Sequence, residues 1–193
     1  MATAPAPTRP PVLNLPNALT TSRLVLAVIL FACISADWWP VGLVVFILAA
    51  ATDWLDGYFA RKMGLAGPFG RNFDPLVDKV LICGAFIFLL PVPEAHLAPW
   101  MVTIVVAREL IITGLRSFLE QQSTNFGADW LGKLKMGLQC AALIAILFVR
   151  SLPADASRFW EAAQVGLIYA MLVATALSGL QYLWRAALLL REP

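Results

Sequence analysis

Six long stretches of the chain are almost continuously apolar, and short polar or proline-containing connections separate them. They are the segments 18–36, 41–62, 75–92, 98–119, 133–152 and 163–190. Each is long enough for a helix that crosses a hydrocarbon layer of about 30 Å. Short connections between such segments place consecutive helices antiparallel. The pattern predicts an all-α integral membrane protein with six transmembrane helices. Residues 1–16 are expected to form a flexible interfacial tail, and residues 17–193 a single six-helix membrane domain.

The composition agrees with this pattern. Apolar residues make up 60% of the 193 residues, and charged residues make up 13%. Soluble domains carry roughly 25% charged residues, and a soluble chain of this size could not hide so much apolar surface from water. Disorder requires the opposite composition. The net charge of +2 gives no support for nucleic-acid binding.

Lysine and arginine side chains indicate an orientation in the membrane. If the N-terminus is cytoplasmic, only Arg150 and Arg158 fall on outer connections. The ten on the inner side are Arg9, Arg23, Arg61, Lys62, Arg71, Arg116, Lys133, Lys135, Arg185 and Arg191. This positive-inside bias predicts that both termini are cytoplasmic. Because no organelle-targeting segment is evident, the bacterial cytoplasmic membrane is the expected location.

Four aspartates lie close together where carboxylates are costly. Asp53 and Asp56 have i, i+3 spacing at the end of the second apolar segment, and Asp74 and Asp78 have i, i+4 spacing at the start of the third. Each spacing puts the pair on one helical face. The glycine-rich link over 63–73 is expected to turn tightly and bring the two faces together. Carboxylates within membrane segments indicate a functional site.

Four converging carboxylates repel one another unless they are neutralised, either by protonation or by cations. Two divalent ions cancel four negative charges, and oxygen ligands without nearby His or Cys favour Mg²⁺ or Mn²⁺ over zinc. A purely structural alternative is that Asp74 caps a helix beginning at Pro75 while Asp53 and Asp56 pair with neighbouring cations. Capping of this kind does not account for all four aspartates.

Eight residues in this region have a fixed spacing over 26 positions. They are Asp53, Asp56, Gly57, Ala60, Arg61, Gly70, Asp74 and Asp78. This run resembles the signature of the CDP-alcohol phosphotransferase family. The segments 14–23, 108–116 and 132–135 resemble those of the branch of that family that forms phosphatidylglycerophosphate.

The resemblance implies the six-helix fold of that family, a homodimer embedded in membrane lipids, and a specific reaction. A phosphatidyl group would pass from CDP-diacylglycerol to glycerol 3-phosphate by direct displacement, with release of CMP. The resemblance also implies that Asp53, Asp56, Asp74 and Asp78 hold two divalent metal ions, Mg²⁺ or Mn²⁺, and that Asp78 is the general base.

The resemblance further implies a set of contacts to CDP-diacylglycerol. These are Asn17, Thr20, Gly57, Ala60, Arg61, Gly67 and Gly70. Gly57 and Ala60 are small, which suits close approach of the nucleotide but equally suits helix packing. Arg61 is expected to contact a phosphate, the alternative being an arginine that extends to the membrane interface.

A dianionic acceptor such as glycerol 3-phosphate needs cations of its own. Arg108 and Arg116 lie eight residues apart, about two helical turns, and Lys133 and Lys135 precede the fifth apolar segment. These four are the candidates for binding the acceptor phosphate. Alternatively, Arg108 forms a structural ion pair with Glu109 or a motif aspartate, and the lysines anchor the helix at the membrane surface.

Two other functions stay open at the level of sequence. One is a sister enzyme of the same family, of the phosphatidylinositol-phosphate or cardiolipin synthase type. The other is a small cation transporter, which is disfavoured because transport requires polar groups at the membrane midplane and the four aspartates are expected near helix ends.

Overall fold

The computed structural model describes the backbone of residues 15–63, 68–121, 130–153 and 158–189, and the side chains of residues 21–52, 76–117, 130–153 and 158–188. The described backbone is helical throughout, apart from short connections. The elements are α1 (Leu15–Ser35), α2 (Trp39–Met63), α3 (Pro68–Leu89), the short 3₁₀ helix η1 (Pro93–Ala95), α4 (Pro99–Gln121), α5 (Trp130–Ser151) and α6 (Arg158–Leu189). The predicted all-α class and the six helices are confirmed over the described residues.

Helix α3 begins at Pro68 rather than at Pro75, which is the largest difference from the sequence pattern. The expectation that Asp74 caps this helix is therefore wrong, because Asp74 lies inside it. Pro68 occupies the first helical position, where a missing N–H costs no hydrogen bond. Pro75 lies in the helix interior, where it removes one backbone hydrogen bond. Much of the expected 63–73 link, Gly70 included, is helical.

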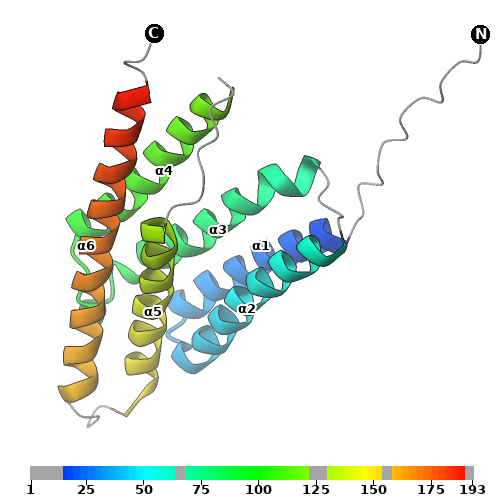
Figure 1. Cartoon of the computed structure of the whole chain (residues 1–193). Coiled ribbons are helices and arrows are strands. Elements are labelled where there is room, and N and C mark those ends of the chain that lie inside the picture. Colours follow the sequence, from blue (N-terminus) through cyan, green and yellow to red (C-terminus); the bar gives the residue numbers. More distant parts are fainter. Residues whose placement is uncertain (1–14, 64–67, 122–129, 154–157, 190–193) are drawn as a thin grey trace, which may run out of the picture.

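The helices form two packed groups (Figure 1). Helix α1 packs against both α2 and α3, while α6 packs against α4 and α5. Contacts between α2 and α5 join the two groups into one core. This core contains buried side chains from all six helices, among them Leu30, Phe46, Phe86, Leu143 and Ile146. Because the chain alternates in direction, the starts of α1, α3 and α5 lie at the same end of the molecule as the ends of α2, α4 and α6.

Apolar side chains also cover the outer faces of the helices. Val28 on α1, Val44 on α2, Leu110 on α4 and Leu180 on α6 are all exposed. A helix that is apolar on its outer as well as its inner face is typical of a membrane environment. Helices α5 and α6 are long and apolar enough to cross a membrane, and the described apolar parts of α1 and α2 are shorter. The six-span arrangement stays a prediction.

Gly84 marks the closest approach between α1 and α3. A Cβ built on Gly84 would lie 2.8 Å from Cε1 of Phe31, whose ring stacks on Phe88 with centroids 4.7 Å apart. We expect Gly84→Ala to displace the Phe31 ring and lower the stability by about 1–3 kcal/mol. Thermal unfolding of the purified protein in detergent measures this loss.

The matched control is Gly114→Ala, because a Cβ on Gly114 meets nothing within 4 Å. We expect this substitution to leave the unfolding temperature unchanged or slightly raised, since alanine favours the helix. Equal unfolding temperatures for the two variants would show that α1 and α3 do not approach each other as closely as the structure has them.

Candidate active site

In the described part of the chain, buried polar residues interrupt the buried apolar stripes of four helices, α1, α4, α5 and α6. On α1 the stripe runs from Ile34 through Leu30 and Ala27 to Arg23, which is fully buried. These positions are three or four residues apart, so they share one face of the helix. Arg23 therefore occupies a position that the packing would otherwise give to an apolar residue.

Three other helices also contain buried polar residues. They are Glu109 on α4, Lys135 and Gln139 on α5, and Gln164, Thr175 and Ser178 on α6. All of them follow or precede buried apolar residues at helical spacing. Buried charges in an apolar bundle are costly unless they are paired, and they mark functional positions by default. The ion pairs and hydrogen bonds of these buried residues therefore indicate which groups the site could bind.

Asp78 is the motif aspartate whose side chain the structure describes. Nη1 of Arg23 lies 2.6 Å from Oδ1 of Asp78, and the Asp78 side chain is 25% exposed. This charge-assisted hydrogen bond fixes the carboxylate from one side. The partial exposure leaves the rest of the carboxylate accessible to a ligand.

Glu109 joins two cations that come from different helices. Its Oε1 accepts a hydrogen bond from Nζ of Lys135 on α5, and Nη1 of Arg108 lies 3.3 Å from the same oxygen. Nη2 of Arg108 also donates to Oγ of Ser178 on α6, at 3.0 Å. The expected alternative for Arg108, an ion pair with Glu109, is thus present. Glu109 ties α4 to α5, and Arg108 ties α4 to α6.

A cavity of about 150 Å³ lies between the Asp78 and Glu109 pairs. Its lining residues are Asp78, Lys79, Ile82, Glu109, Lys135, Met136 and Gln139. Asp78 was expected to act on the reacting hydroxyl and Lys135 on the acceptor phosphate. The structure places both on the wall of one cavity, which residues of α3, α4 and α5 line.

The charge around this cavity suits an anion. The described charged residues that line it or contact its lining are the carboxylates of Asp78 and Glu109 and the cations of Arg23, Lys79, Arg108 and Lys135. Among the described side chains there, four cations stand against two carboxylates. An excess of cations on this wall favours an anionic group such as a phosphate monoester.

A larger cavity, of about 530 Å³, lies between the C-terminal ends of α1 and α3. Its walls include Ile34, Ile87 and Phe88, and its charged residue is Asp37, which is exposed. The polar residues of its described lining are Ser35 and Asp37, and this lining includes no lysine or arginine that could bind an anion. We therefore assign the candidate site to the smaller cavity.

The other two candidate cations, Arg116 and Lys133, are not among the lining residues of this cavity. Nη2 of Arg116 donates to the hydroxyl of Tyr182 at 3.0 Å, and Arg116 is not part of the cavity lining. Lys133 is exposed and lies two residues from Lys135, which turns it to another face of α5. Of the four cations predicted for the acceptor, Lys135 lines the cavity and Arg108 supports it through Glu109.

Most of the remaining predicted site residues have side chains outside the described part of the chain. The backbone places Asp53 and Asp56 in α2 and Asp74 in α3. Because both helices are continuous there, each aspartate pair keeps its predicted shared face. The predicted CDP-diacylglycerol contacts with a described backbone are Asn17 and Thr20 in α1, Gly57, Ala60 and Arg61 in α2, and Gly70 in α3. Gly67 falls outside the described residues. Among the described side chains there is no group of three or more potential metal ligands.

Arg23 and Tyr182 are among the residues around this site that were not predicted to belong to it, and Glu109 was named only as a possible partner of Arg108. Arg23 and Glu109 carried a recognisable signal, because each is a charge at a helical interval from apolar residues that prove to be buried. Tyr182 carried none, since a tyrosine near the end of an apolar helix is common at membrane interfaces. Its hydrogen bond to Arg116 emerges only from the packing of α4 against α6.

Comparison with known proteins identifies the sequence family. The family described as CDP-alcohol phosphatidyltransferase matches residues 13–178. The chain is 39% identical over 162 residues to the CDP-diacylglycerol–glycerol-3-phosphate 3-phosphatidyltransferase of Bacillus subtilis, covering 76% of this chain and 82% of the relative. It is 32% identical over 180 residues to the protein of that name from Escherichia coli K12, covering 88% and 93%.

A third relative has a different printed name. The chain is 35% identical over 169 residues to a cardiolipin synthase (CMP-forming) of Oryza sativa, covering 79% of this chain. The chain spans about half of that relative, at 51% of its length. All three names describe enzymes, which favours an enzyme over the transport alternative.

Proposed function

The chain belongs to the CDP-alcohol phosphatidyltransferase family, and we propose that it transfers the phosphatidyl group of CDP-diacylglycerol to glycerol 3-phosphate and releases CMP. The observation that supports this acceptor best is the cavity shared by Asp78 and Lys135. Its wall carries a carboxylate and a lysine side by side, which suits a small acceptor that has both a hydroxyl and a phosphate group.

The roles of the lining residues follow from their chemistry. The exposed part of the Asp78 carboxylate accepts the proton of the acceptor hydroxyl, whose oxygen then forms a bond to the lipid-linked phosphorus. The bond from that phosphorus to the CMP oxygen breaks, and CMP leaves. Lys135 binds the acceptor phosphate, with Arg108, Arg116 and Lys133 as the further candidates proposed for this group.

The four motif aspartates form a suitable donor set for hard divalent ions. Asp53, Asp56, Asp74 and Asp78 supply only carboxylate oxygens, and their pairwise spacing within continuous helices supports ligation from two directions. Mg²⁺ or Mn²⁺ ions held there would neutralise the diphosphate of CDP-diacylglycerol and stabilise the charge that develops on it. A second set of residues is proposed to contact the nucleotide part of the same substrate. They are Asn17, Thr20, Gly57, Ala60, Arg61, Gly67 and Gly70.

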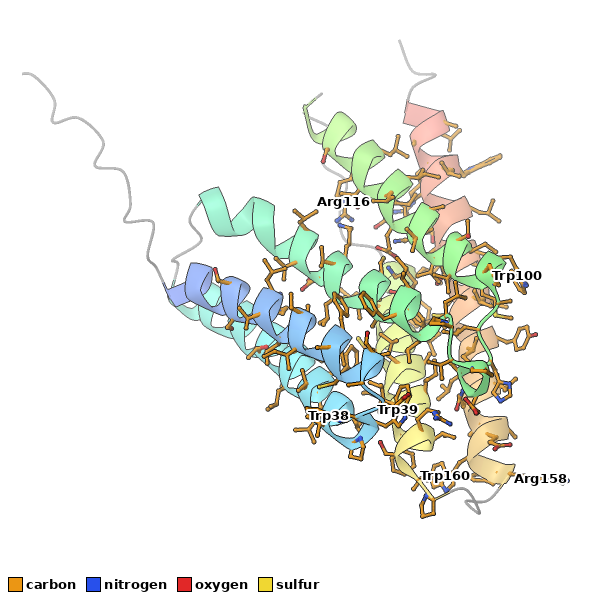
Figure 2. The ribbon with its side chains drawn as sticks, turned by 180° about the vertical axis from the view of Figure 1, so that it is seen from behind. Trp38, Trp39, Trp100, Arg116, Arg158 and Trp160 are labelled. Carbon is orange, nitrogen blue, oxygen red and sulfur yellow. The ribbon has the colours of Figure 1, made fainter. Side chains whose placement is uncertain are left out.

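The membrane arrangement proposed is six spans with both termini and the active site on the cytoplasmic side, in a homodimer. The excess of lysine and arginine on one side supports this orientation. Arg116 lies toward one end of the molecule (Figure 2). Trp38 and Trp160 lie exposed at the opposite end (Figure 2), as expected for side chains at a membrane–water interface.

The assay that tests the function uses purified protein in detergent micelles with CDP-diacylglycerol and glycerol 3-phosphate. We expect CMP release that depends on glycerol 3-phosphate, stops on addition of a chelator and returns with Mg²⁺ or Mn²⁺. Parallel reactions contain phosphatidylglycerol or inositol phosphate as the acceptor. Release of CMP with phosphatidylglycerol but not with glycerol 3-phosphate would assign the chain to the cardiolipin-forming reaction instead.

A further inference from the structure

Helix α6 contributes a polar surface to the site that the motif residues do not include. Ser178 and Tyr182 are buried on the face of α6 that packs against α4, one turn apart. The family match ends at residue 178, so Tyr182 lies beyond it. Neither residue lines the cavity, and neither carries a charge. Their contacts indicate a different role from that of the cavity residues.

Both residues hold an arginine of α4. Nη2 of Arg108 donates to Oγ of Ser178 at 3.0 Å, and Nη2 of Arg116 donates to the hydroxyl of Tyr182 at 3.0 Å. The two guanidinium carbons also lie 5.6 Å and 5.8 Å from the centroid of the Tyr182 ring, within the range of a cation–π contact. One tyrosine thus contacts two cations that would otherwise repel each other.

A glycine on α6, Gly179, leaves room for the side chain of Arg108. A Cβ built on Gly179 would lie 3.2 Å from Cγ of Arg108, so the arginine stem runs close against the helix at that point. The Tyr182 hydroxyl also lies close to the first turn of α5, where a Cβ built on Gly132 would be 3.7 Å away. Helix α5 carries Lys135 one turn further on. Tyr182 therefore connects α4 to the part of α5 that supplies the cavity lysine.

We propose that Ser178 and Tyr182 are positioning residues that set Arg108 and Arg116 for the phosphate of the acceptor. This inference rests on the proposed function. Among the described side chains, the hydrogen-bond partner of Arg116 is a neutral hydroxyl, so its positive charge stays available for an anion. A guanidinium held in one rotamer before binding loses less conformational entropy when the anion arrives. Positioning these arginines is expected to affect binding of the acceptor rather than of CDP-diacylglycerol, because Arg108 contacts Glu109 on the wall of the proposed acceptor cavity.

The test is Tyr182→Phe, which keeps the ring and removes only the hydroxyl. We expect the KM for glycerol 3-phosphate to rise about tenfold, since a hydrogen bond from a charged donor is lost. The KM for CDP-diacylglycerol and the unfolding temperature in detergent are expected to stay near the wild-type values. Ser178→Ala removes the hydroxyl that holds Arg108 and is expected to give the same selective rise by an independent route.

Tyr169→Phe is the matched control, because Tyr169 is an exposed tyrosine on the same helix. It is expected to change neither KM. If Tyr182→Phe and Ser178→Ala leave the KM for glycerol 3-phosphate unchanged, or raise the KM of both substrates together, the positioning role is overturned. Failure of the proposed function is distinguishable, because wild-type protein would then release no CMP with glycerol 3-phosphate at all.

Discussion

Replacing Asp78 by asparagine is expected to reduce the rate of CMP release by about 10²–10⁴-fold, the range over which a general base contributes to catalysis. The substitution preserves the shape of the side chain and removes the charge that accepts the hydroxyl proton. The asparagine oxygen can still accept the hydrogen bond that Arg23 donates to Oδ1 of Asp78, so the buried guanidinium keeps an acceptor. The measurement is the initial rate at saturating concentrations of both substrates.

Asp37→Asn is the control for this experiment. Asp37 is exposed at the end of α1, and its φ of 57° is one that asparagine adopts as readily as aspartate. We expect it to leave the rate unchanged. A rate within about threefold of wild type for Asp78→Asn, with an unchanged unfolding temperature, would remove Asp78 as the base. A lower unfolding temperature in both variants would point to a general effect of the substitution on folding.

The helices were predictable because an apolar segment long enough to form a helix leaves few alternatives. The six expected segments correspond to α1–α6. The start of α3 was missed because the Asp74–Pro75 pair is a strong sequence signal for a helix start. Pro68 gives the same signal, and α3 continues through Pro75 although an interior proline removes one hydrogen bond and crowds the carbonyl four residues before it. Two competing signals of equal strength cannot be ranked from the sequence.

Individual residues of the cavity could be predicted from the sequence, but the contacts between them could not. The spacing of the aspartates identified Asp78. Lys135 was a candidate because it lies at the start of the fifth apolar segment, on the expected cytoplasmic side. Which cations would meet which acids depends on how α3, α4 and α5 pack, and apolar helices carry little sequence information about their neighbours. Glu109 shows this limit, because its pairing with Lys135 spans 26 residues and two helices. The contribution of α6 was unpredictable for the same reason.

Removing the carboxylate of Glu109 is expected to have the largest effect on stability. Glu109→Ala leaves the buried Lys135 and the partly buried Arg108 without the oxygen that both contact. Breaking a buried ion pair by deleting one partner costs about 3–5 kcal/mol, because the remaining charge is left without compensation. The measurement is the free energy of unfolding in detergent. The control is Glu94→Ala, which breaks the 3.4 Å Arg150–Glu94 pair, where the glutamate side chain is 58% exposed. That loss is expected to stay below about 1 kcal/mol.

The double variant Glu109→Ala/Lys135→Met separates stability from function. The methionine replaces the stranded ammonium by an apolar side chain of similar length, so we expect part of the lost stability to return. Activity is expected to stay lost, because the cation proposed for the acceptor phosphate is absent. If the double variant recovers both stability and CMP release, Lys135 has no part in binding the acceptor and its pairing with Glu109 is purely structural. If it recovers neither, the main partner of Glu109 is Arg108, and the α4–α6 contact determines the stability of this end of the bundle.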